Sequence, residues 1–368
     1  MRKRLLLIGG LGFLLLILAL RFAGYIPFIG IPRNVEGNSS ALSFRWAYRN
    51  LAKIRSQPIL AKDLILARTE EELIAVNAIT GKEVWKYSAG SIVIPDNMIL
   101  VQDNLVLVRG NPNSALDVLN LQDGTFQWRL PNAPLDGMIG GAAIDNEKVY
   151  VSRGRSGYVW AYSLNGGKSI WQSPQLESSF VNMVSRPDGL YLFNTLDLIV
   201  LDSETGQVKK YLKNKFEGRQ PILSDDLVIQ QFQKMLIARE LESGKTRWSY
   251  PRNTQGAIGY FGVVNGKVYA SDSCCEIIAL NLTDGNLLWR KQFDSSIDST
   301  VVAIQDLGYV LLQNGSIRAF DLETGGNAGV ISTAPPTTSG YHLDKGLVTD
   351  ATALYATFGN NTLFAFAK

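Results

Sequence analysis

A glycine recurs about every forty residues along most of this chain, and this period constrains the fold more than any local pattern does. The intervals are 43, 43, 39, 38, 41 and 40 residues, between Gly81, Gly124, Gly167, Gly206, Gly244, Gly285 and Gly325. A tryptophan stands four residues after five of these glycines, at Trp85, Trp128, Trp171, Trp248 and Trp289. The fourth and seventh copies have Lys210 and Gly329 instead. Seven copies of one unit indicate a repeat protein.

Each unit contains two β runs, the glycine turn, and a further run that carries the tryptophan. Glycine supplies the positive φ of a tight hairpin, and the Asp, Asn or Thr before it can bond the backbone of the turn. Runs such as Leu73–Val76 are apolar on both faces, as expected for strands sandwiched between neighbouring sheets. We predict that each tryptophan fills the wedge between two blades, burying on the order of 200 Å² of ring, and that its role is packing rather than ligand binding.

The two ends of the repeat array predict how the structure closes. An eighth hairpin, over residues 354–357 and 363–366, is followed by Lys368 without a glycine turn or a tryptophan. Trp46 lies 39 residues before Trp85, which is the repeat spacing, but no inner strands precede it. Residues 42–48 are therefore predicted to form the outer strand of the last blade, which would remove the free edges of the array. The predicted fold is an all-β, eight-bladed propeller over residues 42–368, with four antiparallel strands per blade.

The first forty residues predict a membrane anchor. Arg2, Lys3 and Arg4 precede an uninterrupted apolar run of sixteen residues, Leu5 to Leu20. A cleaved signal peptide is the alternative, but Arg21 occupies the position that a small residue would need for cleavage. We therefore predict one N-terminal transmembrane helix within residues 1–28 and a juxtamembrane linker over residues 29–41. Basic residues before the span place the N-terminus in the cytoplasm and the propeller outside it, at the cell membrane.

Composition excludes several classes of function. Lys and Arg number 36, but five of them fall in the first forty residues, so the body is nearly neutral and has no basic block for nucleic acid. The chain has one histidine, His342, and two cysteines, Cys274 and Cys275. A His/Cys metal cluster therefore cannot be assembled, and we predict no metal site and no catalytic residues.

The repeat string resembles the PQQ-like (pyrroloquinoline-quinone) repeat. It reads Ala-x-Asn-x-x-Thr-Gly-x-x-x-Trp over residues 75–85 and Ala-x-Asn-x-x-Asp-Gly-x-x-x-Trp over residues 279–289. It is similar to the repeat of the propeller lipoprotein in the outer-membrane β-barrel assembly machine and, more distantly, to that of quinoprotein dehydrogenases. The resemblance implies a propeller fold. It implies no cofactor, because the repeat encodes blade packing and the dehydrogenases build their quinone site in long insertions that this chain lacks.

The adjacent cysteines Cys274 and Cys275 are predicted to lie in the turn between the two middle strands of the sixth repeat, on the opposite face from the glycine turns. Adjacent Cα atoms lie about 3.8 Å apart, closer than in ordinary disulfides, so a vicinal disulfide would be strained but could persist outside the cytoplasm. Such a pair lies against the quinone in the similar dehydrogenases. The ligands around it have no counterpart here, so a possible disulfide is expected to be a rigid turn rather than a cofactor site.

Two function hypotheses follow. The first is a non-enzymatic, membrane-anchored, extracytoplasmic scaffold that binds another envelope protein through loops on one face of the propeller. The second is a PQQ-dependent oxidoreductase, or a small-molecule-binding propeller, that uses the central pocket near Cys274 and Cys275.

Overall fold

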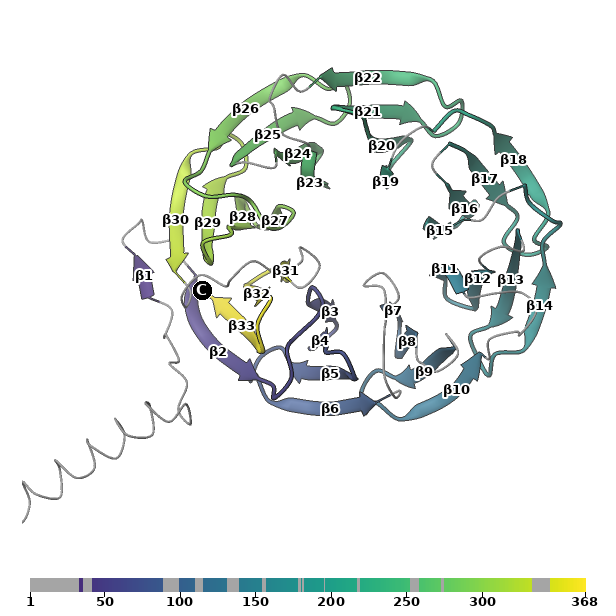
Figure 1. The fold of residues 1–368 in the computed structure, drawn as a ribbon, viewed down its shortest axis with the longest axis horizontal. Helices are drawn as coiled ribbons and strands as arrows, with labels where there is room; N and C mark the ends of the chain where they lie inside the picture. Colours follow the sequence, from purple (N-terminus) through teal and green to yellow (C-terminus); the bar gives the residue numbers. More distant parts are fainter. Residues whose placement is uncertain are drawn as a thin grey trace, which may run out of the picture.

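The computed structural model describes residues 33–35, 42–88, 99–109, 115–130, 139–153, 157–177, 180, 182–194, 196–216, 219–251, 258–272, 275–332 and 345–368. Its regular elements in this part of the chain are all β-strands, arranged as eight sheets around a closed ring (Figure 1). The predicted eight-bladed propeller with four antiparallel strands per blade is confirmed. The predicted anchor over residues 1–28 lies outside the described residues. Within those residues, no helix is long and apolar enough to cross a membrane.

We number the blades in chain order, and strands run from the innermost to the outermost in each blade. Blades 1 to 4 contain β3 (Ile59–Ala61), β4 (Leu64–Arg68), β5 (Glu72–Asn77), β6 (Glu83–Ser88); β7 (Ile99–Gln102), β8 (Leu105–Arg109), β9 (Leu116–Asn120), β10 (Phe126–Leu130); β11 (Ile139–Ile144), β12 (Lys148–Arg153), β13 (Tyr158–Ser163), β14 (Ser169–Gln172); and β15 (Asn182–Arg186), β16 (Gly189–Phe193), β17 (Leu198–Leu201), β18 (Val208–Leu212).

Blades 5 to 8 contain β19 (Arg219–Ser224), β20 (Leu227–Phe232), β21 (Met235–Glu240), β22 (Thr246–Pro251); β23 (Ile258–Val264), β24 (Lys267–Asp272), β25 (Glu276–Asn281), β26 (Leu287–Gln292); β27 (Val302–Ile304), β28 (Leu307–Leu311), β29 (Ser316–Asp321), β30 (Asn327–Ser332); and β31 (Lys345–Thr349), β32 (Ala353–Phe358), β33 (Thr362–Ala367), β2 (Ser43–Arg49). Because strands alternate in direction, the turns within a blade lie on two faces. The Gly-turn face carries the first-to-second and third-to-fourth turns, and the connector face carries the other turns and the connections between blades.

The ring closes by joining the two ends of the repeat array, as the sequence predicted. Strand β2 pairs antiparallel with β33, with Trp46 opposite Ala365, and completes blade 8 from the N-terminal side (Figure 1). The structure adds one strand that the sequence did not predict. Arg33–Val35, within the predicted linker over residues 29–41, form β1, which pairs with β30 as a fifth strand of blade 7.

The glycine turns have the conformation that their sequence predicts. All seven glycines have φ between 67° and 72°, in the left-handed region that favours glycine. Except at Gly167, which follows another glycine, the side chain before the glycine accepts a hydrogen bond from the backbone of the turn, as in Asp123 Oδ1 with the amide of Thr125 at 2.9 Å. A second acceptor, four residues before the glycine, was not predicted: Asn77 Oδ1 accepts from the amides of Ile79 and Thr80. Two side chains thus fix each such turn.

Each repeat tryptophan docks on the glycine turn of the next blade, and we name this contact the tryptophan lock. The indole Nε1 donates to the backbone oxygen three residues before that glycine, at 2.8–3.2 Å, in Trp46, Trp85, Trp128, Trp171, Trp248 and Trp289. The ring covers the glycine so closely that an added β-carbon would lie less than 3.0 Å from an indole carbon. The predicted packing role of these tryptophans is confirmed. Glycine is needed for a second reason, because only a residue without a side chain admits the ring.

The interface between blades 4 and 5 lacks a tryptophan and is filled differently. Lys210 takes the tryptophan position, and its Nζ donates to the backbone oxygen of Glu242 at 3.3 Å. Gly244 is covered instead by Lys215. The fully buried ring of Phe216 packs edge-on against Phe193, with ring centroids 6.0 Å apart. An aromatic ring from the loop after β18 thereby replaces the missing indole.

We call the interface between blades 7 and 8 the seam. There the large residue stands at the glycine position and the small residue at the tryptophan position, the opposite of the tryptophan lock. Gly329 takes the tryptophan position, while Leu42, four residues before Trp46, takes the glycine position and is fully buried. Leu42 packs in one cluster with Ala319 and Tyr309, which are on the seam side of blade 7. The buried Tyr309 hydroxyl has no hydrogen-bond partner among the described residues, whereas the equivalent Tyr269 donates to Leu322 of the next glycine turn. Blade 8 has no glycine turn whose backbone oxygen could accept this hydrogen bond.

We predict that Gly285→Ala destabilises the propeller more than Gly266→Ala does. Both glycines are in blade 6 with φ of 72° and 70°, so each substitution carries the left-handed backbone cost of about 1–2 kcal/mol. A β-carbon at Gly285 also meets the Trp248 ring at 2.6 Å, while nothing lies within 4 Å of one at Gly266. Overpacking should add about 1–3 kcal/mol at Gly285. Urea denaturation measures both variants, and equal midpoints would contradict the tryptophan lock.

Leu42→Ala is predicted to lower the free energy of unfolding by about 2–5 kcal/mol, because it removes a fully buried side chain from the seam. Leu51→Ala is the matched control, since the Leu51 side chain is 101% exposed and should contribute less than about 0.5 kcal/mol. Denaturant titration of the two variants makes the comparison. A Leu42 variant as stable as the Leu51 variant would show that this side chain does not hold the seam.

Candidate interaction surface

The predicted site residues comprise the residues used for packing, Cys275, and residues outside the described part of the chain. The repeat glycines and tryptophans form the locks described above. Cys274 and His342 lie outside the described residues. Among the residues that are described, no group of three or more His, Cys, Asp or Glu side chains could hold a metal ion.

Cys275 lies directly before β25, on the connector face, where the sequence predicted the turn between the middle strands of blade 6. Its amide donates to Asp272 Oδ1 at 2.7 Å, and its Sγ accepts from Gln292 Nε2 at 3.0 Å. Asp272 Oδ1 also accepts from the amide of Glu276 at 2.8 Å. These contacts describe a turn fixed by a carboxylate. The possible disulfide with Cys274 stays a prediction.

A buried ion pair joins blades 7 and 8 at their inner strands. Lys345 Nζ, at the start of β31, lies 2.5 Å from Asp298 Oδ2, and both side chains are only 4% exposed. Burial and the negative charge of Asp298 raise the pKa of Tyr260, on β23, well above its usual value. The tyrosine therefore stays protonated at neutral pH. The described geometry gives these groups a structural role, because the lysine and the carboxylate neutralise each other.

Two surface depressions lie on the Gly-turn face of blades 2 to 4. These adjoining depressions, each of about 530 Å³, share the first turn of blade 3, Asn146 to Lys148. One of them is bordered by Trp128 and Ile170 on the outer strands of blades 2 and 3. The other extends to Arg186 and Glu204 of blade 4.

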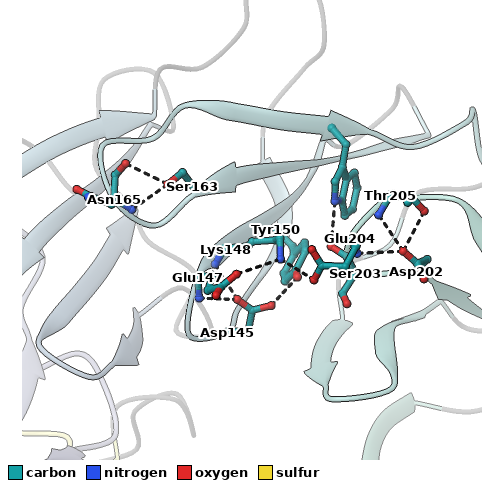
Figure 2. A network of polar contacts seen from close by, with 11 residues as sticks. Asp145, Glu147, Lys148, Tyr150, Ser163, Asn165, Asp202, Ser203, Glu204 and Thr205 are labelled. Carbon is teal, nitrogen blue, oxygen red and sulfur yellow. Dashed lines mark hydrogen bonds and ion pairs between the residues drawn. The ribbon is translucent and has the colours of Figure 1, made fainter.

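A polar network forms the ridge between the depressions (Figure 2). Asp145 accepts from the amides of Glu147 and Lys148 at 2.8 and 2.7 Å, and from the Tyr150 hydroxyl at 2.5 Å. Lys148 Nζ donates to Glu204 Oε1, in the glycine turn of blade 4, at 2.8 Å. The ridge therefore links blades 3 and 4.

Burial decides which charges of this network face solvent. The Lys148 side chain is 6% exposed, whereas Glu204 and Glu147 are 70% and 81% exposed. Burial opposes the charge on Lys148, but the hydrogen bond to Glu204 and the nearby carboxylates of Asp145 and Glu147 outweigh it and raise the pKa of the lysine. The cation thus lies beneath carboxylates, and the ridge presents negative charge beside the exposed side chain of Ile170.

The lysine–glutamate pair is part of the repeat rather than a reactive centre. Lys267 and Glu323 form the same contact between blades 6 and 7, at 2.6 Å. Blades 2 to 4 carry, beside this pair, the two depressions with an apolar border. An open, mixed surface of this kind suits a segment of another macromolecule better than an enclosed small molecule.

Of this surface, sequence reasoning named only Trp128, and named it as a packing residue. The depressions combine side chains from three blades, and Lys148 and Glu204 are 56 positions apart, so their contact is not evident from the sequence. One signal was available: Ile170, directly before Trp171, is an apolar residue in the bulge of an outer strand. Such a residue cannot point into the interface that its neighbour fills.

Comparison with known proteins supports the fold and the family. No curated protein sequence matches the chain. The computationally designed protein Ika8 is 12% identical, with a TM-score of 0.69 over 87% of this chain and 98% of its own. BamB from Moraxella catarrhalis is 16% identical, with a TM-score of 0.62 over 89% of this chain and 100% of its own. A family model described as outer membrane protein assembly factor BamB matches residues 43–250, 134–328 and 233–358. The chain belongs to this BamB family of PQQ-like repeat propellers.

Proposed function

We propose that this protein is a non-enzymatic scaffold that binds another protein of the cell envelope. In this proposal residues 1–28 hold it at the cell membrane and the propeller lies on the extracytoplasmic side. The observation that carries the proposal is the match of the BamB family model, whose three overlapping segments run from residue 43 to residue 358. Members of that family are described as outer membrane protein assembly factors.

The depressions on blades 2 to 4 are the proposed docking surface. Their border offers the exposed Ile170 to an apolar side chain, and Glu147 and Glu204 to a basic one. Lys148 supports the ridge from beneath and is already paired, so it is not available to a partner's carboxylate. A partner segment with alternating apolar and basic residues fits this arrangement.

The sequence of the N-terminal residues supports the anchored arrangement. Arg2, Lys3 and Arg4 precede the apolar run, which favours a cytoplasmic N-terminus. Strands β1 and β2 follow that run and pair with blades 7 and 8. An anchor over residues 1–28 would therefore reach the ring at the outer edge of the seam.

We expect Glu204→Lys to reduce partner binding. The experiment is affinity capture of the full-length protein from mildly crosslinked membranes of its own cells. The matched control is Glu323→Lys, since Glu323 is also largely exposed, in the glycine turn of blade 7, and pairs with Lys267 as Glu204 pairs with Lys148. Both variants place two lysines together, and thermal unfolding of each measures the stability cost. Loss of a complementary charge at the interface should lower capture about tenfold for Glu204→Lys alone.

Equal capture by the two variants would contradict docking at blades 2 to 4. The enzyme alternative is tested on the same purified protein by adding PQQ, recording its visible absorbance and measuring dye reduction. Bound quinone with dye reduction would overturn the scaffold proposal in favour of a quinone-dependent oxidoreductase or a small-molecule-binding propeller.

The proposed topology predicts that Leu51→Cys reacts with a membrane-impermeant maleimide in intact spheroplasts. Leu51 is fully exposed in the connector between β2 and β3, so accessibility depends only on the side of the membrane. The unsubstituted protein measures labelling of Cys274 and Cys275. If the Leu51 variant is labelled above this background only after the spheroplasts are lysed, the propeller lies in the cytoplasm and the proposal is contradicted.

A further inference from the structure

The outer strand of each blade has one edge that faces away from the ring, and such edges can pair with other chains. Charged side chains and proline are the usual protection. Of the eight outer strands, which all lie in the described part of the chain, six contain Lys or Arg: β2, β6, β10, β18, β22 and β26. Strand β14 contains neither, but Pro174 follows it and offers no amide donor. The remaining strand, β30, reads Asn-Ala-Gly-Val-Ile-Ser and has no such protection.

The unprotected edge is the one that the structure covers. Strand β1 pairs antiparallel with β30, with Arg33 opposite Ser332, Asn34 opposite Ile331 and Val35 opposite Val330. In Figure 1, β1 lies outside the ring along β30, next to the start of β2. The next strand in the chain, β2, pairs with β33 of blade 8. The consecutive strands β1 and β2 therefore pair with blades 7 and 8, which lie on either side of the seam.

That interface is also one of the two that have no tryptophan lock. At the seam a leucine replaces the glycine turn, no indole donates across the interface, and the Tyr309 hydroxyl is left without a partner. Contacts near the inner strands remain, including the Lys345–Asp298 ion pair and a hydrogen bond from Thr349 Oγ1 to Ala303 O at 3.0 Å. The outer part of the seam lacks the hydrogen bond that six other interfaces have.

We propose that the outer edge of β30 is a strand-docking site whose occupant is the chain's own segment Arg33–Val35, and that β1 and β2 together form a strap that keeps the seam closed. Docking β1 supplies backbone hydrogen bonds at the outer wall of blade 7, where the tryptophan lock is missing. The residues between β1 and β2 then tether blade 7 to blade 8 covalently. The strap depends on strand pairing and does not require membrane anchorage or a partner protein.

The first test is a disulfide between the paired positions in the full-length protein. Asn34→Cys with Ile331→Cys places two thiols directly opposite each other, within the reach of a disulfide. Lys291→Cys with Asn34→Cys is the matched control, because Lys291 occupies the position of Ile331 in blade 6. Mild oxidation should link the first pair within one chain and leave the second unlinked. Equal yields, or a link between two chains, would overturn the proposal.

The second test measures the seam itself by amide hydrogen exchange. Val35→Pro removes the backbone amide of β1 at the position opposite Val330, without touching a blade. Losing the β1–β30 pairing should speed amide exchange about tenfold at Val330–Ser332 and in β31 and β32. Local opening of the seam would then break fewer hydrogen bonds and cost less free energy. Blades 2 and 3 should exchange as in the parent protein, which also controls for the fold. Unchanged exchange around the seam would show that β1 does not hold it.

Discussion

The contact on which the ring depends is an indole ring lying over a glycine turn of the next blade. It combines three effects that one residue pair rarely supplies together: a large apolar area removed from water, a hydrogen bond from Nε1 to a buried backbone oxygen, and a fit that only glycine permits. The contact involves consecutive repeats, so the same short motif both ends one blade and positions the next. Six interfaces use it, from Trp46 to Trp289.

The two interfaces without a tryptophan show which part of the contact matters. Between blades 4 and 5 the volume of the indole is replaced by Phe216, contributed by a loop. At the seam the large residue moves to the other blade, as Leu42, and the small one is Gly329. All eight interfaces are therefore closely packed, while the hydrogen bond from an indole Nε1 is absent from these two. The seam cannot keep it, because blade 8 takes its outer strand from the N-terminal side and so has no glycine turn.

Repeat packing also determines which parts of this chain are exposed. Residues that hold the ring lie between blades, and the remaining turn residues and the outer strand edges form the surface. On the Gly-turn face, the same lysine–glutamate pair joins blades 3 and 4 and blades 6 and 7, and the depressions beside Ile170 adjoin the first pair. The proposed docking surface thus includes a contact that is itself structural.

The sequence by itself determined the number of blades, the four strands in each, the closure through Trp46 and the packing role of the tryptophans. These follow from spacing and from the residue types that turns and wedges require. The tertiary structure alone decided the interaction surface, β1 and the exchange of Leu42 with Gly329. Lys148 and Glu204 meet only because blades 3 and 4 are placed side by side, and Arg33–Val35 form a strand by pairing with β30. Local sequence encodes a repeat unit, but which distant side chains share a surface depends on how the ring brings the units together.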